Sequence, residues 1–548
     1  MVRGARSAGG RRAAAAIRRH RIAVGVALVA LVVVLVAVPT TAPSPPPPPS
    51  GAVVVPAGVT PPTPAYGAGR TVAGLACGPG VRQVTWSAYA PPCQPAWHGS
   101  NGGATARGVS ATTIRISVRQ SGTDGALDTV LLPAVVGTDA QQLATLQAYV
   151  KVFNRTFELY GRRVVLVPYV GKGDVADEAL GQGQVAAEQD AVTVAGTLGA
   201  FGDLTLTDGS AVYSAALAAE GVVNSSLWVA STASYQANAP WDYAPGASCT
   251  KGAAATAAVL GRQLAGLDAV DGGPAVAGRR RSFGVVYPEA AQSALCAQQV
   301  LADLAASHVA VRQQVAVLAD PSQLADEAAN AVAQLAGAGV TTVACAPCDP
   351  TTIDALMTAA QAQGYQPEWW LQPSVAGGQV GTDALTRALP AAQASHLLSL
   401  GNQDQPFPRQ EAVRAYELGT TDARVPPAPS YTWAYQAALQ LFDGLQLAGP
   451  DLTAANLEAA MGRIPPSAAG GMFGSWRGSA GPWDPASGYR VVKWFADRTS
   501  PTDGRPGTWV ACDGDREFSY AAAGRDVPVH TALVCSPSAA SAADRRTP

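Results

Sequence analysis

The chain has 548 residues, of which 48% are hydrophobic and 14% charged, so it holds enough apolar material for one large core or two medium ones. This composition excludes intrinsic disorder for most of the chain. The formal net charge is −2, and setting aside the seven arginines of residues 1–21 leaves −9 for residues 22–548. An acidic portion of this kind has no electrostatic reason to bind nucleic acid.

The N-terminus carries an export or membrane signal. Residues 1–21 contain seven arginines and no acid, and residues 22–38 (IAVGVALVALVVVLVAV) contain no charge. This pattern predicts a basic flank that stays in the cytoplasm, followed by a transmembrane anchor or the apolar region of a signal peptide. The length fits either, but prolines surround every candidate cleavage site, which favours the uncleaved anchor. We expect the rest of the chain on the extracytoplasmic face of the cell membrane, anchored or secreted.

Residues 39–106 are rich in proline and glycine and are expected to form a linker, whose later part is either a disordered lead-in or a small loop closed by Cys77 and Cys93. All eight cysteines lie beyond the apolar segment, and an even number in an exported chain favours disulfides. Eight cysteines allow 105 pairings. Besides a Cys345–Cys348 pair, discussed below, we expect Cys249–Cys296 and Cys512–Cys535.

From residue 108 onward, short β-branched runs alternate with alanine-rich helical stretches, which is typical of a parallel sheet covered by helices. A first series has expected strands at 112–118, 162–170, 191–196 and 221–224, and expected helices at 139–160, 175–190 and 209–220. An aromatic, turn-rich stretch without a clear period follows and fits a crossover.

A second series then begins. Its expected strands are 282–287, 309–318, 340–344, 367–373 and 395–400, and its expected helices are 250–267, 289–306, 322–337 and 350–364. Helices at 431–449 and 452–461 and an antiparallel pair within 488–513 come last. The pattern predicts an α/β protein with two similar doubly wound parallel-sheet lobes, joined by crossovers, with a cleft between them.

The domain boundaries follow from these series. Lobe 1 is expected over residues 107–245, with about 401–465 returning to it. Lobe 2 is expected over residues 246–400, with about 466–515 returning to it, and residues 516–548 are expected to form a C-terminal tail.

Several stretches resemble the type I periplasmic-binding-protein family, of the branched-chain amino-acid receptor kind. They are RGVSATTIRISV, AYVKVFNRTFELYGRRVVLV, TVAGTLGAFG, FGVVYPEAAQS and the segment that ends in GYQPEW, and they occur in the family's order between residues 107 and 515. The resemblance implies a monomeric receptor without cofactor or enzymatic activity, which closes its lobes on a small solute and delivers it to an ABC permease in the membrane.

The resemblance also implies where the ligand is held, namely at loops that follow strands. On the first lobe these are Ser121 and Gly122, then Gly199, Ala200 and Phe201 after the third expected strand, then Ser225 and Ser226. On the facing lobe they are Tyr287, Ala346 and Trp370. Amino-acid-binding members place a hydroxyl in the third-strand loop, where the stretch GTLGAFGD has only Thr197 near, and an acid in the second lobe, where the loop ACAPC has none. The expected solute is therefore amino-acid-like or, equally, more apolar or aromatic.

Other chemistries have little support. The sequence has no GxSxG stretch and no HExxH, and its five histidines are scattered, so no catalytic residue and no metal site is expected. Two further hypotheses stay open: a sensing or scaffolding ectodomain with the same fold that signals through a partner, and a secreted thiol oxidoreductase that rests on the CxxC of Cys345 and Cys348.

The CxxC lies between an expected strand that ends at Ala344 and an expected helix with Asp349 as its N-cap and Pro350 at its first position. A zinc site needs two more ligands, and the sequence has no second CxxC. We therefore expect an oxidised pair that rigidifies this loop where it faces the cleft.

Overall fold

The computed structural model describes residues 69–120, 136–179, 181–225, 229–372, 383–401, 410–422, 424–467, 473–478, 484–500 and 504–535. Several expectations lie outside these residues: the segments 1–21 and 22–38, the tail from residue 536, and the ligand residues Ser121, Gly122 and Ser226. Among the described residues, no helix is both long and apolar enough to cross a membrane.

The first sheet is parallel throughout, with the strand order β4-β3-β5-β6-β7. Its strands are β3 (Thr113–Gln120), β4 (Arg163–Val170), β5 (Gly202–Asp203), β6 (Val223–Ser225) and β7 (Asp242–Tyr243). Because all strands run the same way, their carboxyl ends meet at one edge of the sheet, where open α/β sheets bind ligands.

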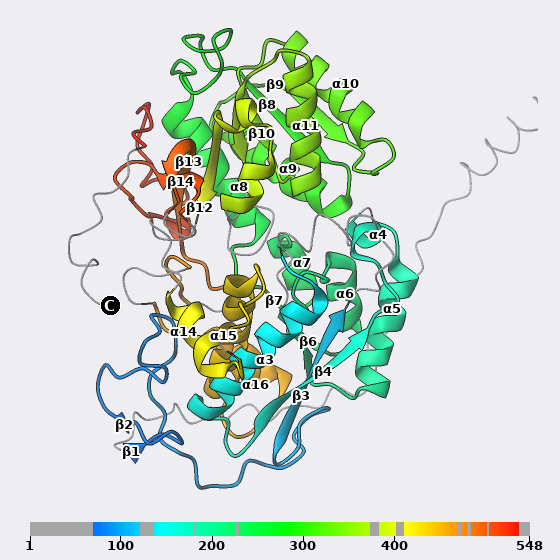
Figure 1. The fold of residues 1–548 in the computed structure, drawn as a ribbon, viewed down its shortest axis with the longest axis vertical. Helices are drawn as coiled ribbons and strands as arrows, with labels where there is room; N and C mark the ends of the chain where they lie inside the picture. Colours follow the sequence, from blue (N-terminus) through cyan, green and yellow to red (C-terminus); the bar gives the residue numbers. More distant parts are fainter. Residues whose placement is uncertain are drawn as a thin grey trace, which may run out of the picture. The chain divides into compact units, whose positions relative to one another are not determined.

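Helices cover both faces of this sheet (Figure 1). On one face, α3 (Asp139–Thr156) shares a core cluster with Ile114 and Ile116 of β3. On the other face and beside it lie α4 (Val175–Ala179), α5 (Gln184–Val192), the π-helical turn η1 (Thr193–Thr197), α6 (Ala211–Ala219) and α7 (Thr232–Ala237). A capping box at Thr138 begins α3: its hydroxyl accepts from the Gln141 backbone N–H, and the Gln141 side chain accepts from the Thr138 N–H.

The predicted strand at 191–196 is wrong, because these residues are helical in α5 and η1. Ala187, Ala191 and Val194 are buried together, at spacings of four and three residues, against Tyr213 and Leu217 of α6. A helical period that buries one continuous face therefore outweighs the local β-branched run. The third strand of this lobe is instead the short β5, about ten residues later in the chain.

The second sheet has the order β14-β13-β12-β11-β10-β8-β9, with β15 paired to β13. Its parallel strands are β8 (Phe283–Pro288), β9 (Val311–Val317), β10 (Thr342–Cys345), β11 (Glu368–Leu371) and β12 (Leu397–Gly401). The strands β13 (Gly488–Thr499), β14 (Pro506–Ala511) and β15 (Phe518–Ser519) add to it in antiparallel fashion. The expected antiparallel pair within 488–513 is thus present.

Helices pack on both faces of the second sheet as well. They are α8 (Cys249–Ala258) with its π-helical continuation η2 (Val259–Leu264), α9 (Ala291–Ala306), α10 (Leu324–Gly337), α11 (Pro350–Ala362), α12 (Asp383–Ala388) and α13 (Ala391–Ala394). Strand alternation sends Trp369 into the cluster with α10 and α11, and Trp370 into the cluster with α8 and η2. Both indoles are fully buried.

Later segments return to the first sheet. The helices α14 (Gln410–Gly419), α15 (Tyr431–Ala448) and α16 (Ala454–Met461) share the core cluster of α3. Phe153 of α3, for example, packs against Tyr435 and Phe442 of α15, with ring centroids 5.7 and 5.2 Å apart.

Residues 69–106 are packed, although we expected a linker over 39–106. The short strands β1 (Gly69–Arg70) and β2 (Ala76–Cys77) pair, and Tyr89 is buried with its hydroxyl donating to the Gly474 carbonyl at 2.9 Å. Trp86 stacks on Tyr435 of α15 with ring centroids 6.3 Å apart. Aromatic residues thus give this segment a core contact that its proline and glycine content does not indicate.

The expected tail is also partly folded, because β15 and the 3₁₀ turn η3 (Tyr520–Ala522) lie within it. Four disulfides connect the described chain in the expected pairs: Cys77–Cys93, Cys249–Cys296, Cys345–Cys348 and Cys512–Cys535.

Candidate ligand site

A pocket lies at the carboxyl edge of the first sheet, where β3 ends. It is lined by Val118, Arg119 and Gln120 of β3, by Asp139, Gln142, Leu143 and Leu146 of α3, and by Leu206 and Asp208 of the loop after β5. Four of these nine residues are apolar and five are polar or charged, so a small molecule could find both kinds of contact here. The parallel topology produces this site, because it brings the end of β3, the loop after β5 and the start of α3 to one edge.

Hydrogen bonds fix the polar wall of the pocket. Gln142 is buried, its Nε2 donates to the Gly137 carbonyl at 3.1 Å, and its Oε1 accepts from the Thr207 hydroxyl at 2.9 Å. The Arg119 backbone N–H donates to the Thr205 hydroxyl at 2.9 Å. The loop after β5 is therefore tied to both α3 and β3.

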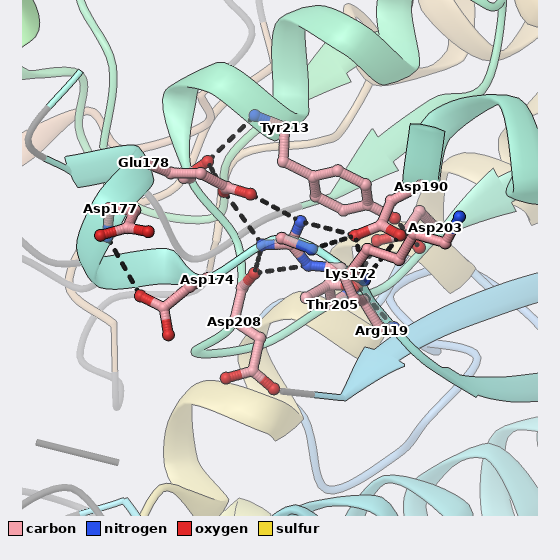
Figure 2. Close-up of polar contacts among 12 residues, drawn as sticks. Arg119, Lys172, Asp174, Asp177, Glu178, Asp190, Asp203, Thr205, Asp208 and Tyr213 are labelled. Atoms are coloured by element: carbon pink, nitrogen blue, oxygen red, sulfur yellow. Dashed lines mark hydrogen bonds and ion pairs between the residues drawn. The ribbon is translucent and has the colours of Figure 1, made fainter. Parts of the chain in front are cut away.

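Behind the pocket, Arg119 is the centre of a buried ionic network (Figure 2). Its guanidinium donates two parallel hydrogen bonds to Glu178 of α4, at 2.9 and 3.0 Å, and one to Asp190 of α5 at 3.4 Å. The guanidinium also lies 4.0 Å from the ring centroid of Tyr213 of α6. Burial alone lowers the pKa of Arg119, but the hydrogen bond and negative charge of Glu178 outweigh burial and raise it.

Asp203, at the end of β5, is a second buried carboxyl beside this network. It accepts from the Ser117 hydroxyl at 2.6 Å, the Thr205 backbone N–H at 2.9 Å and the Tyr213 hydroxyl at 3.1 Å. Burial raises the pKa of Asp203, and these hydrogen bonds act against that rise. Asp203 holds the first residues of the loop that supplies Leu206 and Asp208.

The expected ligand residues Gly199, Ala200 and Phe201 lie at the opposite, amino edge of the first sheet, because they precede β5. The Phe201 N–H donates to the Arg115 carbonyl at 2.9 Å, and Ala200 and Phe201 are buried. Their assignment to the ligand edge is wrong, since it rested on the mistaken strand at 191–196.

Ser225 does lie at the carboxyl end of β6, but it is fully buried. Its hydroxyl donates to Gln440 Oε1 of α15 at 3.4 Å, and Gln440 Nε2 donates to the Ala244 carbonyl at 2.9 Å. The helix α15 therefore covers the position where a ligand contact was expected.

On the second sheet, Tyr287 is half-buried near the carboxyl end of β8, whereas Ala346 and Trp370 are fully buried. The Trp370 indole N–H donates to the Thr256 hydroxyl of α8 at 3.1 Å. Packing within the core of this sheet thus accounts for both Ala346 and Trp370, and their role in ligand binding stays a prediction.

The Cys345–Cys348 disulfide joins β10 to α11, with Asp349 as the N-cap and Pro350 in the first turn, as the sequence predicts. Both cysteines are buried, in a cluster with Ile353 and Leu356 of α11. The disulfide therefore stabilises the core of the sheet rather than a ligand-facing wall. A thiol oxidoreductase needs an accessible thiolate, and this burial argues against one.

No family model and no curated protein matches the chain, but solved structures do. A solute-binding protein of an ABC transporter from Rhodopseudomonas palustris BisB5, in complex with 3,4-dihydroxybenzoic acid, matches 74% of this chain and 98% of its own, with a TM-score of 0.53 and 12% identity. A fatty acid ABC transporter substrate-binding protein from Thermomonospora curvata matches 78% of this chain and 97% of its own, with a TM-score of 0.51 and 14% identity.

The chain has the fold of the type I periplasmic solute-binding proteins. Within this fold, the sequence did not point to the pocket residues Gln142, Leu206 and Asp208. The loop sequence LTLTDGS directly after β5 carries the signal, but a third strand predicted at 191–196 assigns the ligand loop to residues 199–201 instead. A second signal is Arg119, one of the two arginines of the strand sequence TIRISVRQ and the one that is buried.

Proposed function

We propose that this protein is an extracytoplasmic solute-binding protein that captures a small ligand between two lobes for an ABC-type transporter. The observation that carries the proposal is the small pocket at the carboxyl edge of the first sheet, where four apolar side chains lie beside the hydrogen-bonded side chain of Gln142. The shared fold supports it, since solved structures of this fold include ABC-transporter proteins bound to aromatic acids.

The residues define how a ligand would be held. Val118, Leu143, Leu146 and Leu206 offer apolar surface, and covering such surface stabilises a complex by roughly 25 cal/mol per Å². Gln142 is held in one orientation by its two hydrogen bonds, so little side-chain entropy is lost when a ligand arrives. We infer that Tyr287 of the second sheet contributes the opposing surface when the lobes close.

The cellular location is part of the proposal. Four disulfides are typical of proteins that fold outside the reducing cytoplasm. We propose that residues 22–38 anchor the chain, and that a permease in the same membrane receives the solute from it.

The direct test is thermal unfolding of the full chain, purified in mild detergent, with a broad panel of small solutes. A ligand at 100 times its Kd is expected to stabilise the native state by about 2.7 kcal/mol and so to raise the Tm. Native mass spectrometry of the same preparation checks for a co-purified solute of matching mass. A panel without any Tm shift, together with an empty mass spectrum, would contradict the proposal.

A further inference from the structure

The charges around the pocket restrict what it can bind. Two of the nine described residues that line it, Asp139 and Asp208, are acidic, and Arg119 is the only basic one among them. A solute carboxylate would need a cation or free N–H groups to replace its hydration. The question is whether Arg119 can serve.

Arg119 has no N–H left to offer. A guanidinium has five N–H donors. Three are directed at Glu178 and Asp190, as described above, and the other two are directed at the Asp208 carbonyl, from Nε at 3.1 Å and from Nη2 at 2.7 Å. Figure 2 shows the Asp208 carboxylate turned away from the guanidinium, so the carbonyl is the acceptor.

Strand geometry also directs Arg119 away from the pocket. Val118 and Gln120 lie on the face of β3 that packs toward α3, and alternation places the Arg119 side chain on the other face, among α4, α5 and α6. Breaking its buried pair with Glu178 to bind a solute would leave a carboxylate buried without a partner, at a cost of several kcal/mol.

The N-terminus of α3, the other candidate for binding an anion, is capped within the protein. The Thr138 hydroxyl accepts from the Gln141 N–H, and the Gln141 side chain accepts from the Thr138 N–H. Asp139 adds a negative charge to this first turn, which opposes the binding of a solute carboxylate at the helix end.

We propose that the pocket selects uncharged or cationic apolar solutes and rejects carboxylates. This inference rests on the proposed function and specifies its substrate class. It distinguishes this pocket from one built for an amino-acid or aromatic carboxylate, because Arg119, the only cation in the described lining, directs all five of its N–H donors at groups of the protein itself, and two acidic residues lie in the same lining.

The test uses matched triplets on aromatic and aliphatic frameworks, such as benzoate, benzamide and benzylamine, and hexanoate, hexanamide and hexylamine. Titration calorimetry with the full chain is expected to show at least tenfold tighter binding of an amide or amine than of the carboxylate with the same framework. A carboxylate that binds as tightly as its amide overturns the inference and leaves the proposed function intact. Absence of binding throughout a panel of such triplets counts against the proposed function itself.

A charge added to the pocket gives a second measurement. Gln120→Lys replaces a half-buried lining residue by a cation of similar length and is expected to improve carboxylate affinity at least tenfold. Leu143→Lys, at another half-buried lining position, repeats the test from α3. The control Gln361→Lys adds the same charge at an exposed position of α11 and is expected to change nothing. Equal carboxylate affinity in all variants and the wild type contradicts the inference.

Discussion

The buried carboxyl of Asp242 makes the stability of this protein depend on pH in a specific way. Asp242 begins β7, is 2% exposed, and accepts hydrogen bonds from Asn224 Nδ2 at 3.0 Å and Asn238 Nδ2 at 3.1 Å. Burial raises the pKa of Asp242 from 3.8 to about 6, although these two hydrogen bonds oppose the rise. The folded state thus holds the Asp242 proton more tightly than the unfolded chain does.

The sign and size of the effect follow from linkage. Well below pH 3.8 the carboxyl is protonated in both states and contributes no pH dependence. As the pH rises from about 4 to about 6, the unfolded chain releases the proton first, so the native state loses stability. A pKa difference of one corresponds to about 1.36 kcal/mol, so a difference of about 2 lowers the free energy of unfolding by about 3 kcal/mol. This loss is complete above pH 6.

The perturbation is Asp242→Asn, which removes the ionisation and keeps the size of the side chain. The new amide keeps one acceptor oxygen, but its NH2 group faces the NH2 group of Asn224 or Asn238, so a loss of stability that is the same at every pH is expected as well. Urea unfolding measures the difference in free energy of unfolding between the variant and wild type. This difference is expected to be roughly 2 kcal/mol more favourable to the variant at pH 7 than at pH 4.5.

The control is Glu188→Gln, which removes an exposed carboxyl of α5. Its difference from wild type should be the same at both pH values. If the Asp242→Asn variant also keeps a constant difference from wild type between pH 4.5 and pH 7, the reasoning about burial and the pKa of Asp242 is refuted.

Two further predictions concern buried contacts. Glu178→Gln removes the bidentate carboxylate of the buried Arg119 and leaves it only the longer contact with Asp190, so the free energy of unfolding in urea should fall by about 3 kcal/mol, and the double change Arg119→Met with Glu178→Met should recover part of that loss. An equal loss in both would contradict this assignment. Replacing Cys345 and Cys348 together by Ala opens a loop of only four residues and should lower stability by about 2 kcal/mol. Because both sulfurs are buried, wild-type protein should not reduce insulin, and reduction that disappears in the Cys variant would revive the oxidoreductase hypothesis.

Most helices and strands could be predicted from the sequence because the spacing of their apolar residues and the residues at their ends indicate the same element. The second lobe is the clearest case: Asp349 and Pro350 mark the start of α11, and the β-branched run before them is β10. The prediction of a strand at 191–196 is wrong because the short run VTV fits the period of a strand and the period of a helix equally well. The packing against α6 that favours the helix involves residues that are distant in sequence.

The candidate site was harder to predict than the fold, because one misplaced strand moved its loop to the wrong edge. Gly199, Ala200 and Phe201 are expected at the ligand because they follow the strand predicted at 191–196, and those residues form a helix instead. The family resemblance implies a ligand contact for Trp370, but its indole N–H donates to Thr256, which lies more than one hundred residues away in sequence. Residues 69–106 are a similar case, because Trp86 and Tyr89 meet Tyr435 and Gly474 only in the folded chain.

The measurement that tests the central claim most directly is titration calorimetry of the best solute from the panel against a variant in which the pocket is filled. Leu143→Trp, at a half-buried lining position, is expected to weaken binding at least tenfold, or about 1.4 kcal/mol. The control Leu418→Trp places the same side chain at a position of α14 that is 52% exposed and should bind like wild type. Equal affinity of all three proteins would contradict a solute site at the carboxyl edge of the first sheet.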